Sequence, residues 1–251
     1  MPMQAPIPFD VQWQLMMEQA NQWLEGPVGS LLIKEERVPL EQELARFFGS
    51  YLVSFGPGSE STASGAIKHH VRIGPALPGV QVVCEEQAWP VAENAADVVL
   101  LQHGMDFCHS PHGLLREAAR CVRPGGHLIV VGINPVSSWG ARHWFARDGL
   151  GHARCISPGR VADWLALLGF AMEKRRFGCY RPPLASARWQ RRLQGLERMG
   201  ERLQAPGAGF YLLVARKLVV GLRPLPQTRR EPVGKLLPLP VAKISRRDTE
   251  R

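Results

Sequence analysis

The sequence lacks a long apolar run, a signal-peptide pattern and a paired-cysteine motif. None of its hydrophobic stretches approaches the roughly 18 residues that a membrane-crossing helix needs. The N-terminus has no basic region followed by an apolar stretch, so no secretory signal peptide is predicted. The five cysteines include no Cys-x-x-Cys pair, and no acid or cysteine partner is evident for His109 and His112. We therefore expect a cytoplasmic protein with reduced thiols, no metal site and no membrane span.

Acidic residues become scarce toward the C-terminus. Residues 1–171 hold 12 Lys/Arg and 16 Asp/Glu, a balance of −4, whereas residues 172–251 hold 19 and 6, a balance of +13. This asymmetry fits a polyanionic partner such as RNA, and it equally fits a basic segment that only keeps the protein in solution. Residues 218–251 combine five prolines and eight Lys/Arg with no aromatic residue. That composition predicts a flexible tail.

A strand–helix–strand pattern occupies residues 89–135. The run Val98–Leu101 is short and entirely apolar, as expected of a strand that is buried on both faces. Apolar residues then recur at helical spacing over Leu114–Val122, and Arg123–Gly126 ends that helix with proline and glycine. Leu128–Val131 reads as a second buried strand. One strand, one helix and a second strand predict a βαβ unit, and hence a parallel sheet.

This pattern resembles the second half of class I S-adenosylmethionine-dependent methyltransferases, of the type 11-like kind that acts on small molecules. The residues that carry the resemblance are Trp89–Val91, Ala96–Val99, Leu115–Arg120 and Pro124–Gly126. The likeness extends over about residues 25 to 217. It implies an α/β fold: a Rossmann-like three-layer sandwich around a seven-stranded, mostly parallel sheet with strand order 3-2-1-4-5-7-6 and the last strand antiparallel.

The chain divides into three predicted parts. Residues 1–48 form an N-terminal helical extension, residues 49–217 the methyltransferase-like domain, and residues 218–251 the basic flexible tail. A helical insertion is expected at about residues 184–203 of the domain; its arginines fit a solvated helix face, with a surface that contacts phosphates as the alternative.

Two helices are predicted in the N-terminal extension. Asp10 suits the start of the first helix, which Gly26 and the following proline end. Pro39 suits the first turn of a second helix, residues 40–48. In the resembled family such helices lie over the cofactor cleft and shape the substrate pocket. Trp23 is therefore a candidate substrate contact, with simple packing on the sheet as the alternative.

The resemblance places the cofactor S-adenosylmethionine at the turn after Tyr51–Phe55, the predicted first strand. In the family this turn reads Asp-x-Gly-x-Gly-x-Gly, because a side chain would block the approach of the cofactor to the backbone. Gly56 and Gly58 match two of the glycines. Ser54 stands where the acid is usual, and Glu60 replaces the third glycine. All four residues are candidate cofactor contacts.

The family's ribose-binding acid has no counterpart in this sequence. His69–Ile73 is the predicted second strand, and no acid lies between Glu60 and Glu85. Either Glu60 reaches the ribose or the chain has stopped binding the cofactor. After the third predicted strand, Glu85 matches the acid that accepts a hydrogen bond from the adenine amino group, and its neighbour Glu86 is the alternative.

Further candidates follow the fourth and fifth predicted strands. The loop after the fourth strand faces the methyl group in the resembled family, which makes Gln102 a cofactor contact. His103 is the candidate proton acceptor or substrate-orienting group, because its pKa normally lies near neutrality; a structural histidine is the alternative. Asn134 and Trp139, after the fifth strand, are candidate substrate contacts.

The leading hypothesis is methyl transfer from S-adenosylmethionine to an unidentified small-molecule acceptor. The sulfonium is already a good leaving group, so the protein mainly has to align the acceptor with the methyl group. Two alternatives remain open. The missing ribose acid favours an inactive methyltransferase-fold protein with a binding or regulatory role, and the basic C-terminal third favours an RNA-directed methyltransferase. An NAD-dependent enzyme fits less well, because the turn also lacks that family's third glycine.

Overall fold

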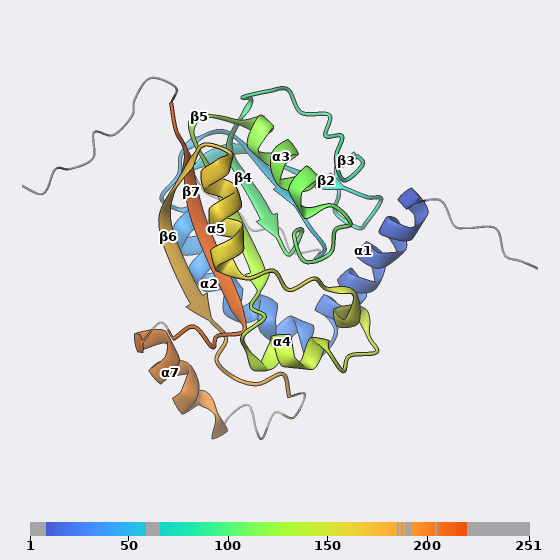
Figure 1. Cartoon of the computed structure of the whole chain (residues 1–251), viewed down its shortest axis with the longest axis vertical. Helices are drawn as coiled ribbons and strands as arrows, with labels where there is room; N and C mark the ends of the chain where they lie inside the picture. The colour runs from blue at the N-terminus through green and yellow to red at the C-terminus, as the bar shows by residue number, and fades with distance from the viewer. Residues whose placement is uncertain are drawn as a thin grey trace, which may run out of the picture. The chain divides into compact units, whose positions relative to one another are not determined.

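The computed structural model describes residues 9–58, 66–184, 186, 188, 192–203 and 205–219. Its centre is a sheet of seven strands in the order β3-β2-β1-β4-β5-β7-β6 (Figure 1). The strands are β1 Gly49–Phe55, β2 Ile67–Gly74, β3 Val82–Val83, β4 Ala96–Gln102, β5 Val122–Ile133, β6 Phe170–Gly178 and β7 Phe210–Lys217. The observed strand order is the one that the sequence predicts.

Parallel pairing dominates the centre of the sheet. Strand β1 pairs in parallel with β2 and β4, and β4 pairs in parallel with β5. Strand β7 runs antiparallel to both of its neighbours, β5 and β6. Residues Ala96–Leu101 of β4 are all buried, which explains their unbroken apolar sequence. The predicted antiparallel last strand is thus confirmed.

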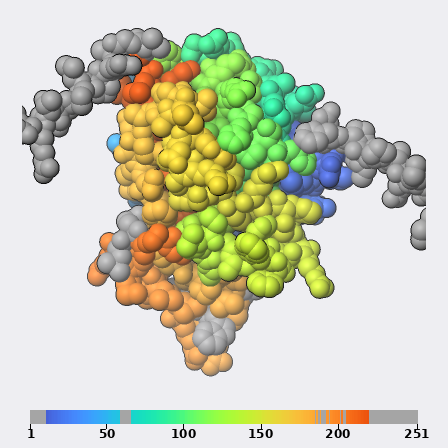
Figure 2. All heavy atoms as spheres, in the orientation of Figure 1, coloured from blue at the N-terminus to red at the C-terminus, as the bar shows by residue number. Residues whose placement is uncertain are grey.

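Helices cover both faces of the sheet and complete a three-layer sandwich. In the view of Figure 1, α3 (Pro111–Cys121) and α5 (Pro158–Leu167) lie in front of the sheet, and α2 (Gly29–Leu44) lies behind it. The space-filling view shows side chains of α3 and α5 covering that front face (Figure 2). The remaining helices are α1 Phe9–Glu25, α4 Ser138–His143, the short 3-10 helix η1 Gly149–His152 and α7 Gln194–Leu203.

Helix α2 corrects one expectation from the sequence. The predicted helix 40–48 is wrong at both ends, because α2 begins at Gly29 and ends at Leu44, with Pro39 inside it. Leu32 and Leu40 lie on one buried stripe of α2, and this packing outweighs the cost of an internal proline. Gly29 allows the close approach of α1 and α2, since a Cβ there would lie 2.2 Å from the carbonyl oxygen of Trp23.

The Pro-Gly-Gly segment also differs from its prediction as a simple turn. Strand β5 already begins at Val122, so Pro124–Gly126 lies within it, beside a register shift between Ala96 and Val98 of β4. Gly125 has φ +79°, which favours glycine. The segment is therefore an irregular beginning of a long strand. Among the helices of the described ranges, none combines the length and apolarity that crossing a bilayer would require.

Candidate functional site

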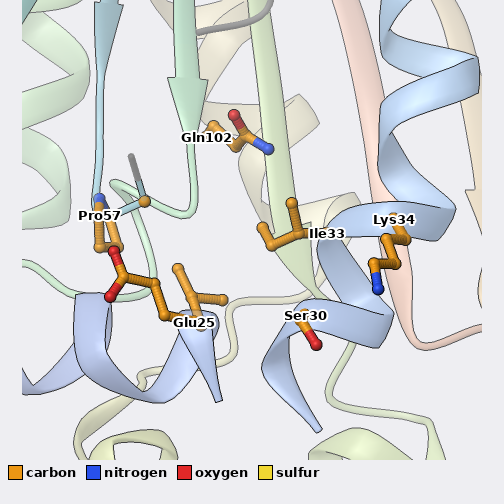
Figure 3. Close-up of a pocket in the computed structure, with 8 residues that line it drawn as sticks. Glu25, Ser30, Ile33, Lys34, Pro57 and Gln102 are labelled. Atoms are coloured by element: carbon orange, nitrogen blue, oxygen red, sulfur yellow. The ribbon is translucent and has the colours of Figure 1, made fainter. Parts of the chain in front are cut away.

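A pocket opens at the edge of the sheet where β1 and β4 end. These strands are neighbours, so the turn Gly56–Gly58 after β1 comes close to Gln102 at the end of β4. Helices α1 and α2 close the other side, and the pocket has a volume of about 210 Å³. Figure 3 shows its labelled lining residues, which are Glu25, Ser30, Ile33, Lys34, Pro57 and Gln102. This is the edge at which open α/β sheets bind their ligands.

Glycine stands at positions 56 and 58 of the turn for two different structural reasons. Gly56 has φ +145°, and a Cβ there would lie 1.8 Å from the backbone oxygen of Gln102. Gly56 is therefore required by the contact between the turn and β4. Gly58 has φ +109°, but a Cβ there would meet only Leu24 Cδ1, at 3.9 Å. Gly58 thus leaves free space on the side of the pocket.

Side chains of the protein already hold part of this turn. The backbone N–H of Gly58 donates a hydrogen bond to Asn21 Oδ1 of α1 (3.0 Å), and Asn21 Nδ2 donates to Glu25 Oε1 (3.0 Å). At the end of β1, Ser54 Oγ lies 2.8 Å from His70 Nε2 of β2. Burial and the nearby Arg72 charge lower the pKa of His70, which is therefore neutral near pH 7. The hydroxyl of Ser54 is engaged with β2.

A buried arginine lies near the place where the family has its ribose-binding acid. Arg72 lies two residues before the end of β2, and only 8% of it is exposed. Its guanidinium donates to the backbone oxygens of Gly56 (3.1 Å) and Pro78 (2.9 Å). Burial lowers the pKa of Arg72 from its usual value. A guanidinium cannot accept hydrogen bonds from ribose hydroxyls, so this region departs from the usual cofactor site.

Comparisons with known proteins agree with this architecture. Residues 59–130 match the family model described as a methyltransferase domain. The seven-stranded sheet has a solved counterpart in a putative methyltransferase of Haloferax volcanii, in complex with the methyltransferase activator Trm112. That structure has a TM-score of 0.56 and 15% identity, and the match covers 80% of this chain and 98% of that chain. The chain is a class I methyltransferase-fold protein.

Two further solved structures have the same fold, and one curated protein is similar in sequence. A possible histamine N-methyltransferase of Thermotoga maritima shares 18% identity with a TM-score of 0.52, over 82% of this chain and 93% of that chain. A geranyl diphosphate methyltransferase in complex with S-adenosylmethionine has a TM-score of 0.52 at 16% identity, and the match covers 73% of this chain and 84% of that chain. The uncharacterized protein YafS of Escherichia coli K12 is 29% identical over 218 residues, which is 84% of this chain and 87% of YafS. The resemblance predicted from residues 89–135 is confirmed.

In this methyltransferase-fold protein His103 is fully buried between two carboxylates. Its Nδ1 lies 3.0 Å from Asp106 Oδ2, and its Nε2 lies 2.8 Å from Glu36 Oε1. All three side chains have 0% exposure. Burial alone would lower the pKa of His103, but the charge of Glu36 and the bonds to both acids raise it to about 10. The geometry favours a structural imidazolium, and a catalytic role for His103 remains an untested prediction.

The carboxylate of Glu36 also contacts a residue that lines the pocket. Gln102 Nε2 donates to Glu36 Oε2 (3.3 Å), so one acid of α2 holds both His103 and a lining residue. Sequence reasoning did not identify Glu36 or Asp106. The available signal was the position of Glu36, which lies between Leu32 and Leu40 on an apolar helical stripe. An acid at such a position needs a buried partner.

The two candidate adenine contacts have different surroundings. Glu86 is 4% exposed, and its carboxylate accepts hydrogen bonds from the backbone N–H groups of His109 (2.8 Å) and Ser110 (2.6 Å). It thereby holds the segment that leads into α3. Glu85 is exposed to solvent. Of the two alternatives, only Glu85 has a carboxylate that is accessible to a ligand. Glu60, the candidate ribose contact, lies outside the described residues.

The candidate substrate contacts hold protein segments together. Asn134 Nδ2 donates to the backbone oxygens of Pro206 (2.5 Å) and Ala208 (2.9 Å) before β7. Trp139 is fully buried, and its indole N–H donates to the backbone oxygen of Arg181 (2.9 Å). Trp23 is 7% exposed. All three stay predictions as substrate contacts; each is buried, and the side-chain N–H groups of Asn134 and Trp139 are bonded to backbone oxygens.

An aromatic stack lies beside the turn after β1. The ring of Phe55 stacks on Trp13 of α1, with centroids 6.2 Å apart, and on Trp89, with centroids 5.2 Å apart. All three residues are buried. Within the described ranges, the indole N–H groups of Trp13 and Trp23 have no hydrogen-bond partner. The stack fixes α1 against the end of β1 and so sets one wall near the pocket.

Proposed function

We propose that this protein transfers a methyl group from S-adenosylmethionine to a small-molecule acceptor. The observation that carries the proposal is Gly58, whose left-handed turn leaves open space in a pocket at the carboxyl edge of β1 and β4. The class I methyltransferase fold makes this edge of the sheet the expected location of the cofactor. The neighbour that binds S-adenosylmethionine is a geranyl diphosphate methyltransferase, which supports a small organic acceptor. A cytoplasmic location belongs to the same proposal.

The pocket suits the methionine end of the cofactor. Its volume of about 210 Å³ is small for a whole nucleoside cofactor, so we assign the adenosine part to the side of β2 and Glu85. The Glu25 carboxylate lies beside Pro57 in Figure 3. A carboxylate there complements the positive charges of the amino group and the sulfonium. When bound, the cofactor supplies the electrophilic methyl group, and Ser30 and Gln102 offer polar groups that orient ligands.

Calorimetric titration with S-adenosylmethionine tests binding, and a plugged pocket tests its location. Ile33 lines the pocket from α2, so Ile33→Trp should fill the cavity without straining the backbone. We expect at least a roughly tenfold loss of affinity, since the ligand and the indole compete for one volume. The matched control is Leu15→Trp at an exposed position of α1. Unchanged affinity of Ile33→Trp would place the cofactor elsewhere.

The role of the negative charge on Glu25 is tested separately. Glu25→Gln keeps an acceptor for Asn21 but removes the negative charge. Its affinity for S-adenosylmethionine should fall by roughly threefold or more, and its affinity for S-adenosylhomocysteine, which lacks the sulfonium charge, should fall less. Glu18→Gln, on the same helix and away from the pocket lining, is the control. Equal losses of affinity for both ligands would show that the sulfonium does not lie near the Glu25 carboxylate.

A cofactor-free binding protein is the second candidate. Two contacts favour it: Arg72 bonds to the turn near the expected ribose position, and Asn21 occupies the N–H of Gly58. Both contacts use groups that a bound cofactor would otherwise find free. If wild-type protein gives no heat with S-adenosylmethionine up to millimolar concentration, the methyl-transfer proposal fails and the cofactor-free alternative stands.

A further inference from the structure

A second and larger cavity lies between α2 and the C-terminal half of β6. It has a volume of about 750 Å³. It lies beside the pocket at the glycine turn but uses a different part of the surface of α2. Ser30 and Ile33 line the pocket, Glu35, Val38 and Gln42 line the second cavity, and Lys34 borders both. We call this second cavity the α2–β6 groove.

Positive charge surrounds a single buried carboxylate beside the groove. Glu43 of α2 is 1% exposed, and its oxygens lie 2.5 Å from Lys174 Nζ, 3.1 Å from Arg176 Nε and 2.7 Å from Arg46 Nη1. Burial raises the pKa of Glu43, but the three cations together lower it below its usual value. The carboxylate is therefore ionised near neutral pH. One negative charge facing three positive charges leaves an uncompensated excess.

The lining of the groove is also positive, with Lys34, Lys174, Arg175 and Arg176 against the carboxylate of Glu35. Lys174 and Arg176 line it, and Glu43 holds both of them in defined positions. The carboxylate that lines the groove, Glu35, is paired with Arg181. Lys34 contacts both cavities and has no hydrogen bond or ion pair with any residue in the described part of the chain. Cations that are fixed before a ligand arrives lose little entropy when they bind it.

Apolar side chains complete the lining. Val38 is 57% exposed, and Pro39, Phe177 and Phe210 also border the groove. The volume falls in the range of about 300–1,000 Å³ that is usual for small-ligand sites. We propose that the α2–β6 groove binds a small organic anion that carries a carboxylate or phosphate next to an apolar portion. The headgroup faces Lys174 and Arg176, and the apolar portion lies against Val38 and Phe177.

Octyl phosphate is a suitable probe because it has both parts of the proposed ligand. Calorimetric titration of the full chain, without any methyl donor, should show binding at least roughly tenfold tighter than that of inorganic phosphate or octanol. Octanoate in a parallel titration shows which headgroup is preferred. Inorganic phosphate binding as tightly as octyl phosphate, or no binding of octyl phosphate or octanoate, would overturn the proposal. Since no methyl donor is present, the result is independent of the proposed methyl transfer.

Matched variants locate the site. Arg176→Gln removes a groove cation and leaves Glu43 paired with Lys174 and Arg46, so the fold should persist. Arg46→Gln removes the same charge from Glu43, but Arg46 does not line the groove. We expect roughly a tenfold weaker affinity for octyl phosphate in Arg176→Gln and little change in Arg46→Gln. Equal losses would show that net charge alone attracts the probe.

A second pair of variants adds a negative charge, the same sign as that of the ligand, at an exposed position. Val38→Asp should repel the headgroup without burying the new carboxylate, since Val38 is 57% exposed. Val11→Asp on α1, where the valine is 46% exposed, is the control. Octyl phosphate should bind less tightly to Val38→Asp alone, while both variants keep the melting temperature of the wild type. Unchanged affinity in Val38→Asp would exclude the groove as the site.

Discussion

His103 shows how single residues in this protein join the N-terminal helices to the sheet. Its ring nitrogens contact Glu36 of α2 and Asp106 of the turn after β4, with all three side chains inaccessible to solvent. Removing one partner of such a buried pair leaves an uncompensated charge. Glu36→Ala should therefore lower the free energy of unfolding by about 3–5 kcal/mol, as measured by urea denaturation.

The control for that measurement lies on the same helix. Glu41 forms an ion pair with Arg37 one turn away, in which Arg37 Nε lies 2.8 Å from Glu41 Oε1. Unlike the buried pair of Glu36 and His103, this pair is exposed to solvent. Glu41→Ala should cost no more than about 0.5 kcal/mol. If Glu36→Ala were equally mild, His103 would not be an imidazolium held by carboxylates.

The raised pKa of His103 predicts a specific pH dependence. The group has a pKa of about 10 in the folded protein and an ordinary value of 6.5 when exposed. Its stabilising contribution is therefore complete below the lower value and is lost as the pH rises toward the higher one. Denaturation of the wild type and His103→Gln at pH 6, 8 and 10 isolates this contribution. The difference between the two proteins should shrink as the pH rises, and a constant difference would contradict the assignment.

The turn after β1 is the element in which fold and site can be separated by mutation. Both glycines have positive φ, so alanine strains the backbone at either position. Only at Gly56 does a Cβ also meet backbone, at 1.8 Å from Gln102 O. Gly56→Ala should cost at least about 3 kcal/mol, against about 1–2 kcal/mol for Gly58→Ala. Thermal and urea unfolding compare the two, and equal costs would disprove the close contact.

Strands are more predictable from this sequence than helices and long-range contacts. Strands such as Ala96–Gln102 are predictable because burial on both faces demands a continuous apolar run. Helix α2 was misjudged, because its packing against the sheet overrides the local preference of Pro39. At the site, the glycine turn and Gln102 are predicted from the resemblance to the methyltransferase family, and Gly58 and Gln102 both line the pocket. Glu36 was missed because its partner His103 lies 67 residues away, and no local pattern reports such a contact.

Positive charge concentrates toward the C-terminus of the whole molecule. The described residues end at Val219, so all of the predicted flexible tail except Leu218 and Val219 lies outside them. The following residues contribute eight Lys/Arg to the basic C-terminal third. If the tail only supplies charge, the fold and any RNA affinity should respond differently to its removal. A chain that ends at Val219 can separate the two contributions.

Truncation after Val219 is therefore expected to leave the melting temperature and the free energy of unfolding close to those of the full chain. Its affinity for a single-stranded RNA probe should fall, and the dependence of log K on log salt should become less steep by up to about 0.7 per lost phosphate contact. Neutralising all eight removed Lys/Arg by Gln in the full-length chain is the matched control, because it keeps the length. An unchanged salt slope in both proteins would rule out the tail as a nucleic-acid contact. In that case the positive charge of the C-terminal third that remains to be explained lies before residue 218, and part of it, Lys174 and Arg176 of β6, lines the α2–β6 groove that we propose for small anions.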